Sequence, residues 1–160
     1  MSSKELVHQP AIPARNIHPS NEWQAFSHSA LDRSLIACFE QVAARYPDRP
    51  AICAINQPAL THNALYQQIA TTAARLNELG IGRHDRVAIV LPNGPVMAVT
   101  FLAVAACATS APLNPGYRAA EFDFYLTDLN AKAVIVDATV ESSVRAVARA
   151  RHIPLIELAT

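Results

Sequence analysis

From residue 62 onward, apolar residues follow two alternating patterns, one with the period of a helix and one of short continuous runs. The helical pattern is clearest over 65–76, where apolar residues recur every three or four positions. The continuous runs 86–91 (RVAIVL) and 133–136 (AVIV) are typical of strands that are covered on both faces of a parallel sheet. Helices alternating with such strands predict an α/β fold, in which a parallel sheet is flanked by helices.

The remaining elements follow from the same patterns. Apolar residues at helical spacing over 35–46 predict a helix, which ends at Pro47 and Pro50. Two short apolar runs around an Asn-Gln-Pro turn predict a small hairpin. The expected helices span 35–46, a stretch beginning near Val96, 121–129 and 140–151; the expected strands are 51–55, 60–61, 109–113 and 155–158.

The first part of the chain shows no hydrophobic periodicity and holds Pro10, Pro13 and Pro19. We expect residues 1–30 to form a loose leader or an irregular strap. Residues 31–160 are then expected to form an N-terminal α/β subdomain, itself an incomplete part of a larger domain.

The stretch 96–113 carries no charge over about one membrane thickness. It is rich in Ala, Thr and Ser, and Pro112 lies near its end, which disfavours a transmembrane span. A buried helix followed by a short strand fits this composition better. Because such a helix is apolar all round, it must be covered on most sides, and we expect segments outside this chain to cover part of it.

The charges balance, with 13 Lys and Arg against 13 Asp and Glu. Neither nucleic acid nor an anionic membrane surface is therefore an expected partner, because both require a basic surplus. The N-terminus lacks the apolar core of a signal peptide. Cys38, Cys53 and Cys107 are widely spaced within apolar runs, which favours buried free thiols in a reducing compartment rather than a zinc site. We expect a cytoplasmic location.

Groups that bind phosphate are scarce. The chain has four glycines and no Gly-Lys-Ser or Gly-Lys-Thr sequence, so it lacks a recognisable phosphate-cradling loop. Gly80 and Gly82 resemble the start of a dinucleotide-binding fingerprint, but they follow a helix and precede a strand, which is the reverse of the required order. We interpret them as a helix cap and a turn. The two lysines are Lys4, in the leader, and Lys132, which is expected to face solvent before a strand.

The histidines also indicate no chemistry. No two of them stand at metal-ligand spacing, and none has an evident catalytic partner. A Gly-x-Ser-x-Gly elbow is absent, so a serine hydrolase has no support. The six are His8, His18, His28, His62, His84 and His152.

Arg145, Arg149 and His152 fall at spacings of four and three in the last predicted helix. That arrangement could grip a phosphate. The favoured interpretation is a solvated helix face with cations near its C-terminal end.

Three aromatic residues, Phe122, Phe124 and Tyr125, surround Asp123. They could line a pocket. Packing of the core at the start of a helix is the preferred interpretation, because large apolar side chains are most often buried.

Three stretches together resemble a known family: 43–54 (AARYPDRPAICA), 60–94 (from LTHNALYQQ to VAIVLPNG) and 111–136 (APLNPGYRAAEFDFYLTDLNAKAVIV). The family is the adenylate-forming superfamily of acyl-CoA synthetases, luciferases and peptide-synthetase adenylation domains. The resemblance runs from about Leu31 to Asp137 and is most specific over Pro112 to Leu126. The sequence of that stretch is most similar to the oxalate–CoA ligase branch, and other small acyl-CoA ligases remain alternatives.

The resemblance implies an ATP-dependent, AMP-forming acid–thiol ligase. A carboxylate would attack the α-phosphate of ATP to give an acyl-adenylate, and coenzyme A would displace AMP, with Mg²⁺ neutralising the phosphates. The family's phosphate loop, which ends in Pro-Lys-Gly, and its catalytic lysine have no counterpart in these 160 residues. No catalytic, cofactor-binding or metal residue is therefore carried over, and the chain alone is expected to be inactive.

Two hypotheses stay open, with a third, weaker one behind them. The chain is an N-terminal fragment of a ligase, or it is a non-catalytic binding or structural module of the same fold. A Rossmann-like nucleotide binder is disfavoured by the missing glycine fingerprint. The sequence that follows Thr160 in the reading frame separates the first two. If the chain is part of a larger core, we also expect it to self-associate through uncovered apolar surface.

Overall fold

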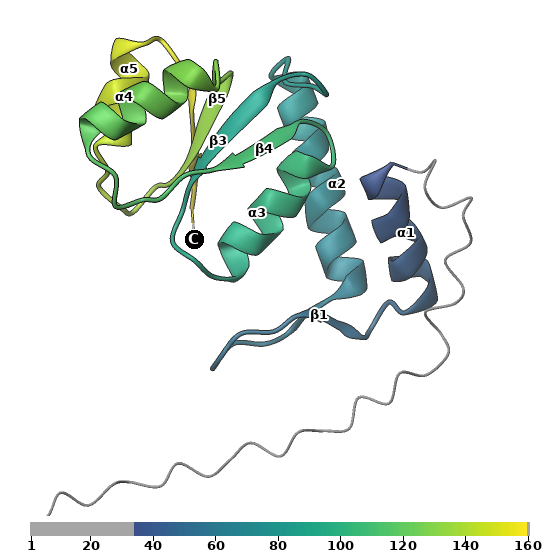
Figure 1. The fold of residues 1–160 in the computed structure, drawn as a ribbon. Coiled ribbons are helices and arrows are strands. Elements are labelled where there is room, and N and C mark those ends of the chain that lie inside the picture. The colour runs from purple at the N-terminus through teal and green to yellow at the C-terminus, as the bar shows by residue number, and fades with distance from the viewer. Residues whose placement is uncertain (1–33, 160) are drawn as a thin grey trace, which may run out of the picture. The chain divides into compact units, whose positions relative to one another are not determined.

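The computed structural model describes residues 34–159, and the predicted leader at 1–30 lies outside that range. Helices and strands alternate along most of the described chain, as the hydrophobic pattern predicts (Figure 1). The helices are α1 (Leu35–Arg45), α2 (His62–Glu78), α3 (Pro95–Ala105), α4 (Ala119–Asp128) and α5 (Val144–Ala150). The strands are β1 (Pro50–Ile52), β2 (Leu60–Thr61), β3 (Arg86–Val90), β4 (Thr109–Pro112), β5 (Ala133–Asp137) and β6 (Leu155–Leu158).

Four strands form one parallel sheet in the order β4-β3-β5-β6. Strand β3 pairs with β4 on one side and with β5 on the other, for example Val87 with Ser110 and with Ala133. Strands β3 and β5 are therefore interior, which confirms the prediction made from their continuous apolar runs. Each connection between successive parallel strands includes one helix.

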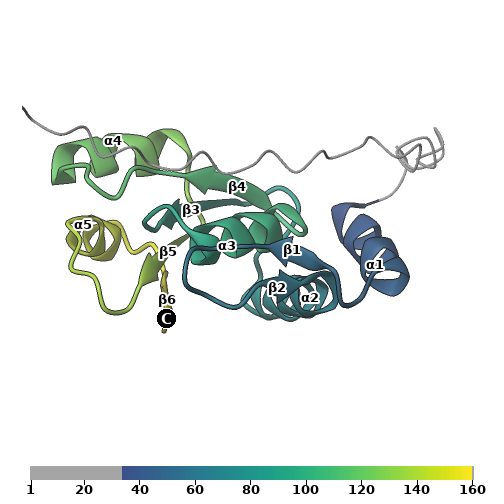
Figure 2. The same ribbon diagram turned by 90° about the horizontal axis from the view of Figure 1, so that it is seen from below.

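Helices cover both faces of this sheet (Figure 2). Because successive side chains of a strand point to opposite faces, Val87 and Ile89 pack under α2 and α3, whereas Ala88 and Val90 pack under α4 and α5. Strand β5 divides its residues in the same way. For this reason both strands are apolar at all of their buried positions, 87–90 in β3 and 133–136 in β5.

A third apolar cluster ties α1 and the β1–β2 hairpin to α2 and α3. It centres on Leu65, Ile69 and Ala103, with Phe39 and Ile52 packed against it. The hairpin is antiparallel, as predicted. Its first strand is shorter than the expected 51–55, because the chain leaves the extended pairing after Ile52 and turns at Asn56, whose φ is 58°.

The last helix is also shorter than predicted. We expected a helix over 140–151, but α5 begins at Val144. The preceding residues form a turn instead, in which Asp137 Oδ1 accepts hydrogen bonds from the backbone N–H and the hydroxyl of Thr139, both at 2.7 Å. A short polar side chain that bonds its own backbone competes with helix formation at this point.

Helices α2, α4 and α5 all end in the same kind of turn before a strand begins. At the end of α2, the backbone N–H of Ile81 donates to Leu76 O at 3.0 Å, and that of Gly80 donates to Asn77 O at 2.9 Å. This is a Schellman motif, with Gly80 in the left-handed region at φ 73°. Asn130 (φ 46°) and His152 (φ 57°) hold the same position after α4 and α5.

We predict that Gly80→Ala lowers the free energy of unfolding by about 1 kcal/mol, because a Cβ disfavours the left-handed conformation. Gly82→Ala is the matched control. Neither glycine has an atom within 4 Å of an added Cβ, and only Gly80 has a positive φ. Chemical denaturation of both variants measures the difference. Equal effects at the two positions would contradict this account of the turn.

Candidate functional site

In open α/β sheets, ligands bind beyond the carboxyl ends of the strands. The parallel order of this sheet brings three loops to that edge, at 91–94 after β3, 113–118 after β4 and 138–143 after β5. These loops are where the chain would contribute to a catalytic centre, so their geometry decides what chemistry they support.

The loop after β3 leads into the N-terminus of α3. A helix N-terminus binds an anion through its free backbone N–H groups, and Pro95, the first residue of α3, supplies none, so one of these donors is missing. The only glycine in this loop, Gly94, has no atom within 4 Å of where a Cβ would stand, so close packing does not require a glycine there. The first turn of α3 also carries no side-chain cap.

The loop after β4 is held by aromatic packing. Tyr117 stacks on Tyr125 with ring centroids 5.1 Å apart and meets Phe122 edge-on at 5.8 Å. The pKa of the Tyr117 phenol is raised, first because it hydrogen-bonds to Tyr125 and then through repulsion from the charged form of that residue. The Ser143 hydroxyl donates to Tyr117 O at 3.1 Å, which connects this loop to the start of α5. Tyr117 is thus held against the core cluster that Phe122 shares with β3, β5 and α5.

The expectation that the aromatic residues near Asp123 form core holds only in part. Phe122 is fully buried. Phe124, in contrast, is 63% exposed and only touches the edge of Tyr125, so core packing was wrong for this residue. The Oδ1 of Asp123 accepts a hydrogen bond from Arg151 Nε at 2.6 Å.

The Asp123–Arg151 pair joins α4 to the residue that follows α5. Its hydrogen bond holds the pKa of Asp123 below its ordinary value and raises the pKa of Arg151. A carboxyl group with a depressed pKa in the folded chain stabilises it above the ordinary pKa of the group. That contribution is lost as the pH falls through the folded pKa.

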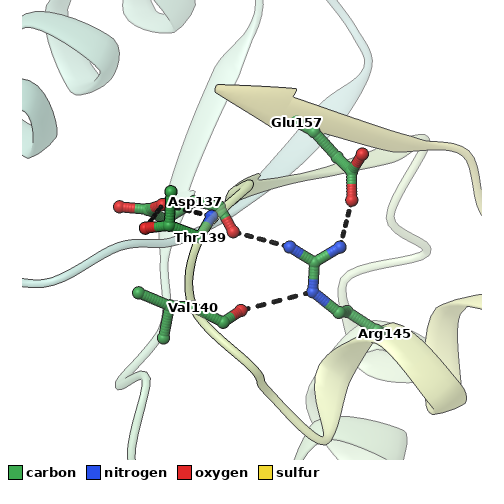
Figure 3. A network of polar contacts seen from close by, with 5 residues as sticks. All are labelled: Asp137, Thr139, Val140, Arg145 and Glu157. Carbon is green, nitrogen blue, oxygen red and sulfur yellow. Dashed lines mark hydrogen bonds and ion pairs between the residues drawn. The ribbon is translucent and has the colours of Figure 1, made fainter. Parts of the chain in front are cut away.

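At the carboxyl ends of β5 and β6, the Arg145 guanidinium binds three partners (Figure 3). It donates to Asp137 O at 2.6 Å and to Val140 O at 3.3 Å, and it forms an ion pair with Glu157. Arg145 is buried, whereas the Glu157 side chain is half exposed. The guanidinium therefore fastens the loop after β5 to strand β6.

The interpretation of Arg145, Arg149 and His152 as one solvated helix face was wrong for Arg145, and the structure does not form a phosphate grip from them either. The guanidinium of Arg145 donates to two backbone carbonyls and to Glu157. Arg149 is exposed on α5. His152 lies beyond the end of the helix in a left-handed conformation and is exposed.

Metal ligands do not gather in the described part of the chain: residues 34–159 contain no group of three or more His, Cys, Asp or Glu side chains that could hold an ion. The three cysteines are free, but none is fully buried, and Cys53 is exposed, which corrects the expectation of buried thiols. Partial burial raises the pKa of the Cys107 thiol. Of the histidines, His8, His18 and His28 lie outside the described residues.

A shallow cavity of about 570 Å³ lies between α2, α3 and the end of β6. Its lining combines glutamine and threonine side chains of α2 with Val96 and Val99 of α3, and it contains no charged residue. It offers amide and hydroxyl groups but no acid, base or nucleophile with a shifted pKa.

Among the described residues, no helix is both long and apolar enough to cross a membrane, as expected.

Comparison with known proteins gives the family. The sequence model of the family described as AMP-binding enzyme matches residues 39–158, which include the whole four-stranded sheet. This chain belongs to that family, which confirms the resemblance drawn from the sequence motifs.

The individual relatives of this chain include CoA ligases. An oxalate–CoA ligase of Arabidopsis thaliana is 41% identical over 104 residues, which are 64% of this chain and 20% of the relative. A Humulus lupulus protein named "Probable CoA ligase CCL9" is 38% identical over 116 residues, which are 72% of this chain and 22% of the relative. The chain thus spans about a fifth of the length of these relatives.

Among solved structures, the N-terminal domain of FACL13 from Mycobacterium tuberculosis superimposes with a TM-score of 0.64 at 25% identity. The match covers 79% of this chain and 33% of that domain. The sheet and its helices therefore correspond to part of the N-terminal domain of an adenylate-forming enzyme, as the predicted fold class required.

We predict that Arg145→Met lowers the free energy of unfolding by about 1–2 kcal/mol, because Val140 O loses its side-chain donor and Asp137 O keeps only a longer bond, from the Val140 N–H at 3.4 Å. The contribution of the ion pair is discounted, since the Glu157 side chain is 51% exposed. Arg149→Met on the same helix is the control and should change stability by less than about 0.5 kcal/mol. Urea denaturation of both variants tests this, and similar losses in the two would show that Arg145 has no special role.

Proposed function

We propose that this chain is the N-terminal part of an ATP-dependent, AMP-forming acyl-CoA ligase. The observation that carries the proposal is the family match across the entire parallel sheet, together with CoA ligases among the relatives at 41% and 38% identity. The proposed substrates of the whole protein are a small carboxylic acid, with oxalate as the first candidate, ATP and coenzyme A. Mg²⁺ is its proposed cofactor, and the cytoplasm stays the predicted location.

In the proposed reaction, a carboxylate oxygen attacks the α-phosphorus of ATP and pyrophosphate leaves. The coenzyme A thiolate then attacks the acyl carbon and AMP leaves, so that a thioester forms. The catalytic demand is to position donors around the transferring phosphorus, because positioned charges supply most of the rate enhancement in such reactions.

The described residues do not fit this demand by themselves. Pro95 removes a backbone donor where a phosphate could approach α3, and no cluster of carboxylates within 34–159 offers Mg²⁺ a site. No step of the reaction is therefore assigned to a residue of this chain. Its proposed role is to form a rigid sheet whose carboxyl edge carries loops that complete a site with other segments of the whole protein.

Helix α3 supports the proposal that further segments pack on this chain. It is apolar all round, and yet Val96 is 42% exposed and Phe101 is 39% exposed. Thr100, Ala103 and Val104 are buried, and Met97, Val99 and Leu102 pack against the core clusters, so most of the helix is covered. The uncovered part is the side that carries Val96 and Phe101. An uncovered apolar side is also what would drive the predicted self-association of the isolated chain.

We predict that residues 1–160 alone do not catalyse ATP–pyrophosphate exchange with any carboxylate, oxalate included. The longer protein encoded by the same reading frame should catalyse it with at least one small acid. Both proteins would be assayed with the same panel of acids, and a heat-denatured sample is the control. Exchange by residues 1–160 alone would contradict the proposal that catalysis requires segments outside this chain.

Failure of the longer protein to exchange with any acid would instead favour the non-catalytic module. In that outcome, the reading frame after Thr160 would also be expected to lack a Ser/Thr/Gly-rich phosphate loop. The two observations are independent of each other, so together they separate a ligase from a module of the same fold.

A further inference from the structure

A second cavity, of about 510 Å³, opens at the opposite edge of the sheet, where β5 and β6 begin. Its volume falls within the range of small-molecule pockets. Its lining comes from the end of α4 and from the two connections that lead into β5 and β6. The lining residues are Leu126, Thr127, Asn130, Ala131, Lys132, Arg151, His152, Ile153 and Pro154.

The floor of this cavity is apolar and fixed by backbone hydrogen bonds. Leu126 and Ala131 close the Schellman turn after α4, where the backbone N–H of Ala131 donates to Leu126 O at 3.1 Å. Ile153 closes the turn after α5, where its N–H donates to Ala148 O at 2.9 Å. Both turns therefore present an apolar side chain at a defined position.

The rim, by contrast, is rich in donors and has no carboxylate among the lining residues. Asp123 binds Nε of Arg151, so neither terminal amine of that guanidinium has a partner within 34–159. The ammonium of Lys132 and the imidazole of His152 likewise have no side-chain partner in this described range.

Helix capping does not account for these donors. Cations near a helix C-terminus are favoured by the helix dipole and can bind the last free carbonyls. Here the carbonyls of Leu126 and Thr127 already accept backbone N–H groups of the Schellman turn. After α5, the carbonyls of Ala148 and Arg149 are occupied in the same way. The side-chain donors on the rim are therefore available to a ligand.

We propose that this cavity binds a phosphate ester with a small apolar body. The phosphate oxygens accept from Lys132, Arg151 and His152, and the apolar body lies on the partly exposed side chains of Ala131 and Ile153. An acceptor-only anion matches a rim that offers several donors and no carboxylate. This site is separate from the carboxyl edge, where the ligase chemistry of the whole protein is proposed.

The test is a titration of the isotopically labelled chain with phenyl phosphate, followed by the amide resonances of 126–132 and 151–154. Inorganic phosphate and benzyl alcohol are the two comparison probes, one without the apolar body and one without the charge. We expect saturable shifts confined to these segments, with phenyl phosphate binding more tightly than either comparison probe.

Lys132→Met should weaken the binding of phenyl phosphate by about tenfold, the loss of one charge-assisted hydrogen bond. Arg75→Met removes an exposed cation from α2, outside the cavity, and should leave the affinity unchanged. Lys132 is exposed, so both variants are expected to keep the wild-type amide spectrum.

Three results would overturn the proposal. The first is a set of shifts that spread over all exposed cations without saturation. The second is an equal loss of affinity in Lys132→Met and Arg75→Met. The third is benzyl alcohol binding as tightly as phenyl phosphate, which would leave only an apolar depression.

Discussion

The fold depends on the burial of two neighbouring strands on both of their faces at once. Val87, Ile89, Val134 and Val136 are all at most 1% exposed. Burying one such side chain contributes roughly 1.5–3 kcal/mol, so β3 and β5 together supply much of the free energy that opposes chain entropy. This requirement calls for helices on both faces, and the chain supplies them by alternating helix and strand.

Parallel pairing then divides the sheet into two unlike edges. At the amino edge, compact Schellman turns lead from a helix into a strand, and the chain has little freedom there. At the carboxyl edge, longer loops leave the strands and are held by side chains, by Tyr117 after β4 and by Arg145 after β5. The arrangement suits a scaffold, since side chains of neighbouring elements hold these loops in place at the carboxyl edge.

Elements and layers were predictable from the sequence because they depend on local period and on continuous apolar runs. Contacts between elements were harder to predict from the sequence. Arg145 has the spacing of a solvated helix face, and its burial depends on where Glu157 and the carbonyl of Asp137 lie after folding. Phe124 could have been assigned correctly, because two positions along a helix differ by about 200° and Phe122 already faces the core. The turns at Asn130 and His152 were missed because only Gly80 carries the usual glycine signal.

The central claim, that β3 and β5 are the most stable part of the chain, is tested most directly by native-state hydrogen exchange. Amides of Val87–Val90 and Val134–Val136 should exchange only through global unfolding, whereas those of the β1–β2 hairpin and α1 should exchange through smaller openings. The hairpin has only two short strands, and its tip residue Ile55 is 90% exposed. Exchange from β3 and β5 at the rate of the hairpin would contradict the account.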